Sequence, residues 1–151
     1  MTLSANSHPS EITLDIGGEG RHADAWNLNP SHVKTLGPSR GEPIPNHIPG
    51  RAEKIPFESN SIDRIIVERS PLLLATIHEI ARVIHEQGTI TLVHALSNDH
   101  DPHQLARAVL PGSVRQRQTR IGNQRCQETV FAVGMQPNDL LSAHITATDS
   151  I

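Results

Sequence analysis

The 151-residue sequence contains no tyrosine, and its only Phe or Trp side chains are Trp26, Phe57 and Phe131. Hydrophobic residues make up 36% of the chain, so the predicted core is aliphatic and thin. Cys126 is the single cysteine, which means that the chain cannot build an intramolecular disulfide framework. This absence excludes disulfide-stapled secreted scaffolds and favours a reducing, cytoplasmic location.

Long apolar runs are also missing. No stretch approaches the roughly 18 apolar residues of a membrane-spanning helix. Residues 1–10 are polar, contain Pro9 and lack the apolar segment of a signal peptide. We expect a soluble protein without a membrane partner. The net charge of −3 gives no general attraction for nucleic acid, so no nucleic-acid partner is expected either.

The length fits one domain, since domains commonly run about 100–150 residues. Regular patterning extends over residues 11–135, which we predict to form that domain, with a flexible N-terminus at 1–10 and a C-terminal tail at 136–151. The sequence has no internal repeat or heptad array, which excludes solenoids and coiled coils.

The first half of the sequence predicts short strands and long loops. Residues 12–16 form a β-favouring run that ends in the turn Gly17-Gly18-Glu19-Gly20. Residues 25–29 predict a second short strand. The Pro- and Gly-rich stretch 31–49 predicts a loop with one helical turn near residues 32–36.

The second half alternates strands with helices. Residues 62–68 contain the uninterrupted apolar run that is typical of a central parallel strand. Residues 73–84 repeat apolar positions at helical spacing, with Gly88 as the stop signal of that helix. Residues 89–96 then predict another buried strand.

The last segments predict a short helix and a hairpin. Asp101-Pro102 is a favourable helix start for residues 103–110, with Asp101 as N-cap. Residues 114–121 and 128–133 flank Gly122-Asn123 and predict two antiparallel strands. The whole pattern predicts an α/β fold with a mostly parallel, doubly wound sheet and a C-terminal antiparallel hairpin.

The connection between the first two predicted strands is unusually short. Parallel neighbours normally need a crossover of a dozen or more residues, yet only residues 21–24 separate the glycine turn from the next strand. Either the first helix is deleted and a tight arch replaces it, or the second strand is misplaced. A deletion reduces the helix content and leaves one sheet face bare, which we expect a second copy of the chain to cover as a homodimer.

The glycine turn is the first candidate for ligand binding. Ligands of open parallel sheets bind beyond the carboxyl ends of the strands, where this turn is predicted to lie. Glycine lets the backbone approach a ligand without a Cβ in the way. A plain tight turn is the alternative explanation.

Three segments, in order, carry a resemblance to a known family. Residues 14–20 resemble an acidic strand residue followed by a glycine-rich cofactor turn, and residues 51–66 are similar to a Leu-Pro-Phe segment that leads into a strand. Residues 79–92 resemble the helix-to-strand passage usually written E-x-x-R-V-L-x-P-G-G. The family is the class I S-adenosylmethionine-dependent methyltransferases, which have a Rossmann-like fold, and the chain is similar to a short, divergent member.

The resemblance implies S-adenosylmethionine as cofactor. The cofactor-binding residues that it implies, from the methionine end to the adenine side, are Asp15, Gly17, Gly18, Gly20, Asn29, Arg51, Ala52 and Glu53. Two positions depart from the family's pattern. Asn29 stands where an acidic residue usually holds the ribose hydroxyls, and Arg51 stands where an aspartate commonly lies on the adenine side.

Methyl transfer needs few compulsory side chains. The methyl carbon on the sulfonium is already electrophilic, so the protein mainly aligns the acceptor and accepts a proton. We take Glu68, His94 and His22 as the catalytic candidates, and Glu19 and Arg69 as further polar residues near the predicted strand ends. Structural or solvent-facing roles are the alternative for each.

Ten histidines raise the question of a metal site, and they are densest between His94 and His103. We predict none, because residues 99–103 fit a polar loop before a helix and no second ligand group follows at recognisable spacing. The predicted hairpin carries four arginines without aromatic residues between them: Arg115, Arg117, Arg120 and Arg125. Such charges discourage edge-to-edge pairing of exposed strands, an explanation that we prefer to nucleic-acid binding.

Two functional hypotheses follow. The first is a methyltransferase that acts on a small molecule. The second is a methyltransferase-like module for binding or assembly that has lost catalysis. The methyl acceptor is not predicted, since this fold hosts many substrates. Both hypotheses require residues 12–20, 62–68 and 89–96 to reach the same rim of one sheet.

Overall fold

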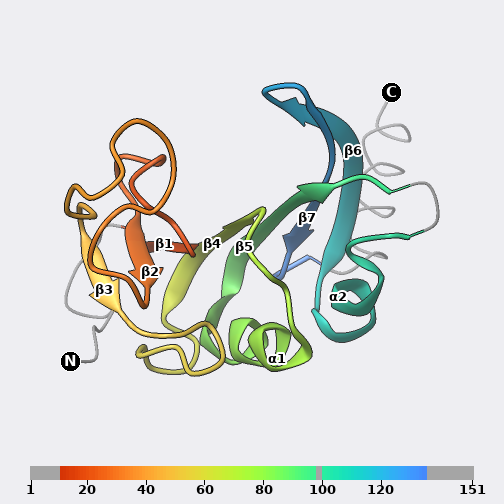
Figure 1. Cartoon of the computed structure of the whole chain (residues 1–151). Helices are drawn as coiled ribbons and strands as arrows, with labels where there is room; N and C mark the ends of the chain where they lie inside the picture. Colours follow the sequence, from red (N-terminus) through yellow and green to blue (C-terminus); the bar gives the residue numbers. More distant parts are fainter. Residues whose placement is uncertain (1–10, 98–99, 136–151) are drawn as a thin grey trace, which may run out of the picture.

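The structure is a computed structural model that describes residues 11–97 and 100–135. These residues form one sheet with the strand order β3-β2-β1-β4-β5-β7-β6 (Figure 1). The strands are β1 Thr13–Ile16, β2 Trp26–Asn29, β3 His47–Pro49, β4 Ile62–Glu68, β5 Ile84–Ala95, β6 Ser113–Ile121 and β7 Gln124–Ala132. The helices are α1 Leu74–Val83 and α2 Gln104–Val109. Both predicted tails, and Asp99 of the predicted loop, lie outside the described residues.

The sheet has a parallel part and an antiparallel part. Strands β3, β2, β1, β4 and β5 run parallel to their neighbours. Strand β7 lies antiparallel between β5 and β6. The predicted mixed sheet and its C-terminal hairpin are therefore confirmed, with β7 starting four residues earlier than predicted, at Gln124 rather than Glu128.

A tight arch joins β1 to β2. The two strands pair in parallel, with Asp15 beside Asn27, and the connecting residues 17–25 contain no helix. The amide of Gly17 donates to the Leu28 carbonyl at 2.8 Å and extends the ladder beyond the end of β1. Of the two alternatives for this connection, the deleted helix is the correct one.

Both described helices lie on the same face of the sheet (Figure 1). The core joins β1, β4, β5 and β7 to α1 and α2 through alternate strand residues and the inner faces of the helices: Leu14, Ile16, Ile65, Val67, Ile90, Leu92, Phe131, Ile77, Ile80, Val83 and Ala106. The expectation that helices cover both faces of a doubly wound sheet is therefore not met in the described part of the chain. No helix in that part is long and apolar enough to cross a membrane.

The opposite sheet face is mainly polar. Side chains alternate along a strand, so the positions that do not face the helices point to this side. They include Arg64 and Thr89, which are paired neighbours, as well as Thr91. Their apolar neighbours Ile66 and Val93 are 8% and 5% exposed. The bare apolar face that motivated the homodimer is thus absent from the described residues, and the homodimer remains a prediction without that support.

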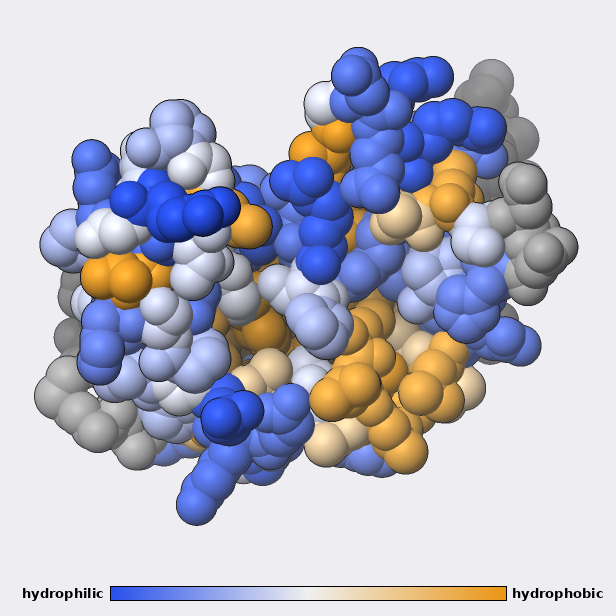
Figure 2. Space-filling view, in the orientation of Figure 1, coloured by the Kyte–Doolittle hydropathy of each residue, from blue (hydrophilic) through white to orange (hydrophobic). Residues whose placement is uncertain are grey.

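Exposed apolar side chains instead gather over the helices. Figure 2 shows this patch, and Leu73, Leu74 and Leu105 are about half exposed at 54%, 47% and 48%. Leu74 begins α1 and Leu105 belongs to α2.

Helix α1 ends earlier than predicted. Asn60 and Ser61 donate their amides to the carbonyls of Arg82 and Val83, which terminates the helix at Val83. Strand β5 then begins at once, because Ile84 pairs with Ile62 of β4. The prediction of Gly88 as helix stop is wrong, since this residue lies inside β5.

Three further local predictions are wrong. Residues 32–36 form no helical turn; Val33 bridges to Pro43 and the amide of Lys34 donates to the Glu42 carbonyl. Strand β3 was not predicted, because Pro45 lies just before it and Pro49 is one of its three residues, yet it pairs in parallel with β2. Helix α2 begins at Gln104, and Asp101 accepts the amide of His103 at 2.9 Å instead of acting as the N-cap.

Candidate functional site

The predicted rim exists. Strands β1, β4 and β5 are adjacent and parallel, so their carboxyl ends meet at one edge of the sheet. A cavity of about 190 Å³ lies at this edge. Its lining comes from the ends of β1 and β2, from the loop after β3 and from the turn after β4: Ile16, Gly17, Leu28, Pro30, Gly50, Arg51, Ala52, Glu53, Ser70 and Pro71. The rim therefore collects Gly17, Arg51, Ala52 and Glu53, four of the predicted cofactor residues.

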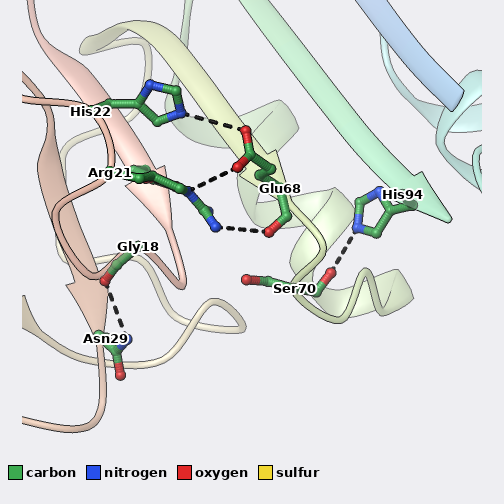
Figure 3. Close-up of polar contacts among 8 residues, drawn as sticks. Gly18, Arg21, His22, Asn29, Glu68, Ser70 and His94 are labelled. Atoms are coloured by element: carbon green, nitrogen blue, oxygen red, sulfur yellow. Dashed lines mark hydrogen bonds and ion pairs between the residues drawn. The ribbon is translucent and has the colours of Figure 1, made fainter. Parts of the chain in front are cut away.

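Asn29 is not among the residues that line this cavity. Its side-chain amide donates to the Gly18 carbonyl at 3.2 Å (Figure 3), and its Oδ1 accepts the amide of Ser31 at 2.9 Å. Asn29 is 8% exposed. An asparagine can donate and accept at once, whereas an ionised carboxylate only accepts. The departure from the family's acidic residue is thus explained by a contact that ties β2 to the glycine turn.

The glycine turn is filled closely by the protein's own side chains. Gly17 has φ +76°, a conformation that favours glycine, and a Cβ there would collide with the Ser70 hydroxyl. The side chains of Asp15 and Asn27 leave no room for a Cβ at Gly18. Internal packing therefore accounts for these glycines, and only Gly17 also lines the cavity.

Asp15 is held by an arginine that the sequence analysis did not single out. Asp15 is fully buried, and the Arg21 guanidinium contacts both its oxygens, Nη2 to Oδ1 at 2.7 Å and Nε to Oδ2 at 3.0 Å. Arg21 Nη1 also donates to the Glu68 carbonyl at 3.0 Å (Figure 3). Burial raises the pKa of Asp15, while the hydrogen bonds and charge of Arg21 act in the opposite direction.

Two of the three catalytic candidates lie together. His22 Nε2 is 3.6 Å from Glu68 Oε1, and Arg21 Nε is 3.6 Å from Glu68 Oε2 (Figure 3). The buried Nε2 atom of His22 has no hydrogen-bond partner among the described residues. Neither His22 nor Glu68 lines the 190 Å³ cavity.

The third candidate, His94, is engaged at both ring nitrogens. Its Nε2 lies 2.7 Å from the Ser70 carbonyl, and its Nδ1 lies 2.8 Å from His103 Nε2. His103 Nδ1 lies 2.7 Å from the Thr129 hydroxyl. Because a carbonyl only accepts, His94 carries its proton on Nε2, so His103 donates to His94 and Thr129 donates to His103. This chain of hydrogen bonds fixes Ser70, which lines the cavity.

His103 is fully buried, and no sequence pattern indicated its role. Burial, with a smaller contribution from His94, lowers the pKa of His103 to about 4. Burial also lowers the pKa of His94. Both rings are therefore neutral near pH 7, as the hydrogen-bond chain requires.

The E-x-x-R residues of α1 hold the segment that follows the cavity-lining loop. Glu79 Oε1 accepts the Ile55 amide at 2.8 Å, and Arg82 donates to the carbonyls of Ile55 and Phe57 at 2.8 and 3.0 Å. Glu79 and Arg82 also pair at 2.7 Å. The helix thereby fixes the backbone just after Glu53.

A second cavity, of about 330 Å³, lies on the other side of Gly17. Its lining includes Glu19 and Arg69, two polar residues that the sequence analysis placed near the strand ends, together with Arg21 and Lys34. The Glu19 carboxylate accepts hydrogen bonds from the Thr35 amide and hydroxyl at 3.0 and 2.6 Å.

Residues 11–97 and 100–135 offer little that would bind a metal ion or nucleic acid. No three His, Cys, Asp or Glu side chains converge there as a metal site would require. On the hairpin, Arg117 pairs with Glu128 at 2.7 Å and Arg125 donates to Gln118 at 2.9 Å. Two of the four hairpin arginines are thus engaged across the β6–β7 pair.

Comparison with known proteins identifies the fold. No protein-family model matches the sequence, and no curated protein matches it. Among solved structures, a SAM-dependent methyltransferase from Aquifex aeolicus is similar with a TM-score of 0.54 and 15% identity, covering 82% of each chain. The 16S rRNA (adenine(1408)-N(1))-methyltransferase W203A mutant from Catenulisporales acidiphilia, with cosubstrate SAM, has a TM-score of 0.54 and 14% identity, covering 85% of this chain and 87% of its own.

A third similar structure is that of an enzyme named for a different substrate. CrArsM, an arsenic(III) S-adenosylmethionine methyltransferase from Chlamydomonas reinhardtii, has a TM-score of 0.52 and 17% identity, covering 84% of this chain and 64% of its own. At such identities the likeness establishes the fold alone. The chain has the class I methyltransferase fold, as its sequence motifs predicted.

Proposed function

We propose that this chain binds S-adenosylmethionine and transfers its methyl group to a small molecule. One observation carries the proposal. The 190 Å³ cavity at the carboxyl ends of β1 and β2 is lined by Gly17 and by Arg51, Ala52 and Glu53, residues that the family resemblance assigns to the cofactor. Four residues from two distant segments converge on one cavity of a methyltransferase fold.

The cavity suits the adenosine part of the cofactor. Pockets for drug-sized ligands commonly hold about 300–1,000 Å³, so 190 Å³ is too small for the whole cofactor. Its walls include Leu28 and Pro30 on the β2 side and Pro71 after β4, apolar surfaces suited to a flat base. Arg51 and Glu53 would hold the polar edge of the nucleoside, and the methionine part would lie beside Gly17.

Methyl transfer requires few protein side chains. When bound, the cofactor would supply an electrophilic methyl group on a sulfonium, and the acceptor would give up a proton on taking this group. The rim would align the acceptor, which is the main requirement of such a transfer. Glu68, or His22 beside it, would accept the released proton.

A second candidate function is a binding module without catalysis. The observation that favours it is the Arg21 guanidinium, which occupies both oxygens of Asp15 at 2.7 and 3.0 Å. Asp15 is then not available to a cofactor, and the Gly18 turn is filled by side chains of the chain itself. A cofactor must displace part of this packing before it can bind.

Calorimetric titration with S-adenosylmethionine and with S-adenosylhomocysteine separates the two candidates. The methyltransferase is expected to give saturable heat and a raised melting temperature, because a ligand that binds only the folded state stabilises it. Ala52→Trp fills the cavity and is expected to abolish both signals. Ala108→Trp, at an exposed position of α2, is the matched control. No signal from the wild-type chain at millimolar ligand would leave the binding module as its function.

A small acceptor is preferred to nucleic acid. One similar structure is an rRNA methyltransferase, but the net charge of this chain is −3, and Arg117 of the hairpin is paired with Glu128. Binding to nucleic acid depends mainly on unpaired cations that contact phosphates. The check is a gel-shift titration with RNA at low salt, where a salt-sensitive shift would contradict the small-molecule acceptor.

A further inference from the structure

The second cavity is positively charged. We call it the cationic cavity: about 330 Å³, lined by the glycine turn, by the loop after β2 and by Arg69 after β4. Its charged lining residues are Glu19, Arg21, Lys34 and Arg69. Gly17 belongs to its lining and also to that of the adenosine-sized cavity, so the two cavities adjoin.

The charges within it are not balanced. The Glu19 carboxylate is occupied by the amides of Thr35 and Leu36 and by the Thr35 hydroxyl. Arg21 is paired with the buried Asp15. Among the described residues, no carboxylate lies within 4.0 Å of the Lys34 or Arg69 side-chain nitrogens. The lining thus holds three cations and one carboxylate, and two of the cations, Lys34 and Arg69, have no ion-pair partner among the described residues.

Arg69 is also held in a conformation that arginine disfavours. Its φ is +63°, and its amide donates to the Val93 carbonyl of β5 at 2.8 Å, which fixes the turn. Glycine would adopt this conformation without strain. Backbone strain of this kind concentrates at functional sites, where the surrounding structure maintains it. The fold therefore does not explain why position 69 carries a long cationic side chain.

We propose that the cationic cavity binds an anionic group, a carboxylate or a phosphate, of the methyl acceptor. Arginine and lysine recognise these groups through charge-assisted hydrogen bonds, and the planar arginine fork matches their geometry. An acceptor held there by its anionic group would lie next to the cofactor's position, across Gly17. The identity of the acceptor rests on the function proposed above, whereas the binding of an anion by this cavity does not.

The first test measures anion binding without cofactor. Inorganic phosphate and pyrophosphate are titrated into the full chain and followed by nuclear magnetic resonance or calorimetry. Lys34→Gln and Arg69→Gln are each expected to weaken binding about tenfold, the size of one charged hydrogen bond. Arg120→Gln, an exposed hairpin arginine, removes the same charge elsewhere and is expected to change nothing. Equal affinities in all four proteins would overturn the proposal.

Arg69→Gly separates binding from folding. This variant removes the side chain and relieves the backbone strain, so its urea unfolding midpoint is expected to equal or exceed that of the wild type. Its phosphate affinity is expected to fall as in Arg69→Gln. A lower unfolding midpoint with unchanged phosphate affinity would show that Arg69 serves the fold, and would overturn the proposal.

The second test distinguishes the acceptor's anion from the cofactor's own carboxylate. S-adenosylhomocysteine carries that carboxylate, and 5′-methylthioadenosine is a related nucleoside without the amino-acid part. We expect Lys34→Gln and Arg69→Gln to bind both compounds as the wild type does. Weaker binding of S-adenosylhomocysteine alone would assign the cavity to the cofactor. The chain could also bind phosphate but neither nucleoside. This result would refute both the methyltransferase function and the assignment of the anion to a methyl acceptor, and only an anion-binding site would remain.

Discussion

At the scale of single residues, Arg21 determines the state of Asp15. Asp15 is fully buried, and Arg21 is its cationic partner at 2.7 Å. Arg21→Ala leaves a buried carboxylate unpaired, which we expect to destabilise the fold by about 3 kcal/mol. The measurement is urea denaturation at pH 7.

The control for this prediction is Arg117→Ala. Arg117 also pairs with a carboxylate at 2.7 Å, but its side chain is 68% exposed. Exposed pairs contribute little, so we expect a far smaller change than for Arg21→Ala. Adding Asp15→Asn to Arg21→Ala is expected to recover part of the loss, because the buried charge is removed. Similar losses for the two arginine variants would contradict the explanation by burial.

A buried histidine gives the fold a dependence on pH. The pKa of His103 is about 4 in the folded protein, below its ordinary value of 6.5. Between these values the unfolded chain binds the proton more readily, so stability is present above pH 6.5 and is lost as the pH falls toward 4. We expect this one residue to cost about 2 kcal/mol between pH 7 and pH 5.

The check is urea denaturation of His103→Gln at the same two pH values. Each protein is compared with its own stability at pH 7, so a general loss from the substitution cancels. The variant is expected to lose about 2 kcal/mol less than the wild type on acidification. His78→Gln, at an exposed position of α1, should retain the wild-type dependence. Parallel pH profiles for all three proteins would refute the assignment to His103.

Sequence motifs brought four predicted cofactor residues to one cavity because the motifs record backbone geometry. Gly17 and the segment Arg51, Ala52 and Glu53 follow strand ends, so the sheet brings them to one cavity. The roles of Arg21 and His103 could not be predicted. The pairing of Arg21 with Asp15 matters because Asp15 is buried, and the Thr129 partner of His103 is distant in the sequence, 26 residues away on β7.

At the scale of elements, the turn after β1 is matched to the turn after β4. Gly17 has φ +76° and faces Ser70, whereas Gly37 has φ +74° with nothing near its missing Cβ. Gly37→Ala therefore measures backbone strain alone, roughly 1–2 kcal/mol. Gly17→Ala adds a collision with Ser70, and overpacking adds about 1–3 kcal/mol.

Urea denaturation of both glycine variants tests this difference. Introducing Ser70→Gly is expected to bring the cost of Gly17→Ala down toward that of Gly37→Ala, because the colliding atoms are gone. If the two alanine variants cost the same in the wild-type background, Ser70 does not restrict the turn. The same conclusion would follow if Ser70→Gly did not reduce the free-energy cost of Gly17→Ala.

Elements were predictable where one local pattern determines them. Residues 62–68 were predicted as a strand and form β4 with the same bounds, because an apolar run between polar turns specifies a central strand. The end of α1 was not predictable from Gly88. It depends on Asn60 and Ser61, which approach Arg82 and Val83 only in the folded sheet.

At the scale of the whole molecule, the sheet is covered unevenly. Helices α1 and α2 lie under the side of β4, β5 and β7, while loops surround β2 and β3 (Figure 1). The lost helix between β1 and β2 was predictable from a four-residue gap in the sequence. The polar character of the uncovered face was not, because it depends on the register that places Arg64 beside Thr89.

This uneven cover predicts unequal local stability. Strand β4 pairs on both sides and its Ile65 and Val67 are fully buried, whereas β3 is an edge strand of three residues, none of them buried. Local opening needs less free energy where few apolar groups are buried. We expect the amides of β3 and its loop to exchange hydrogen through local opening, and those of β4 and β5 only through global unfolding. The measurement is native-state hydrogen exchange in low urea. If β3 and β4 share one opening free energy and one urea dependence, the sheet opens as a single unit despite its uneven cover.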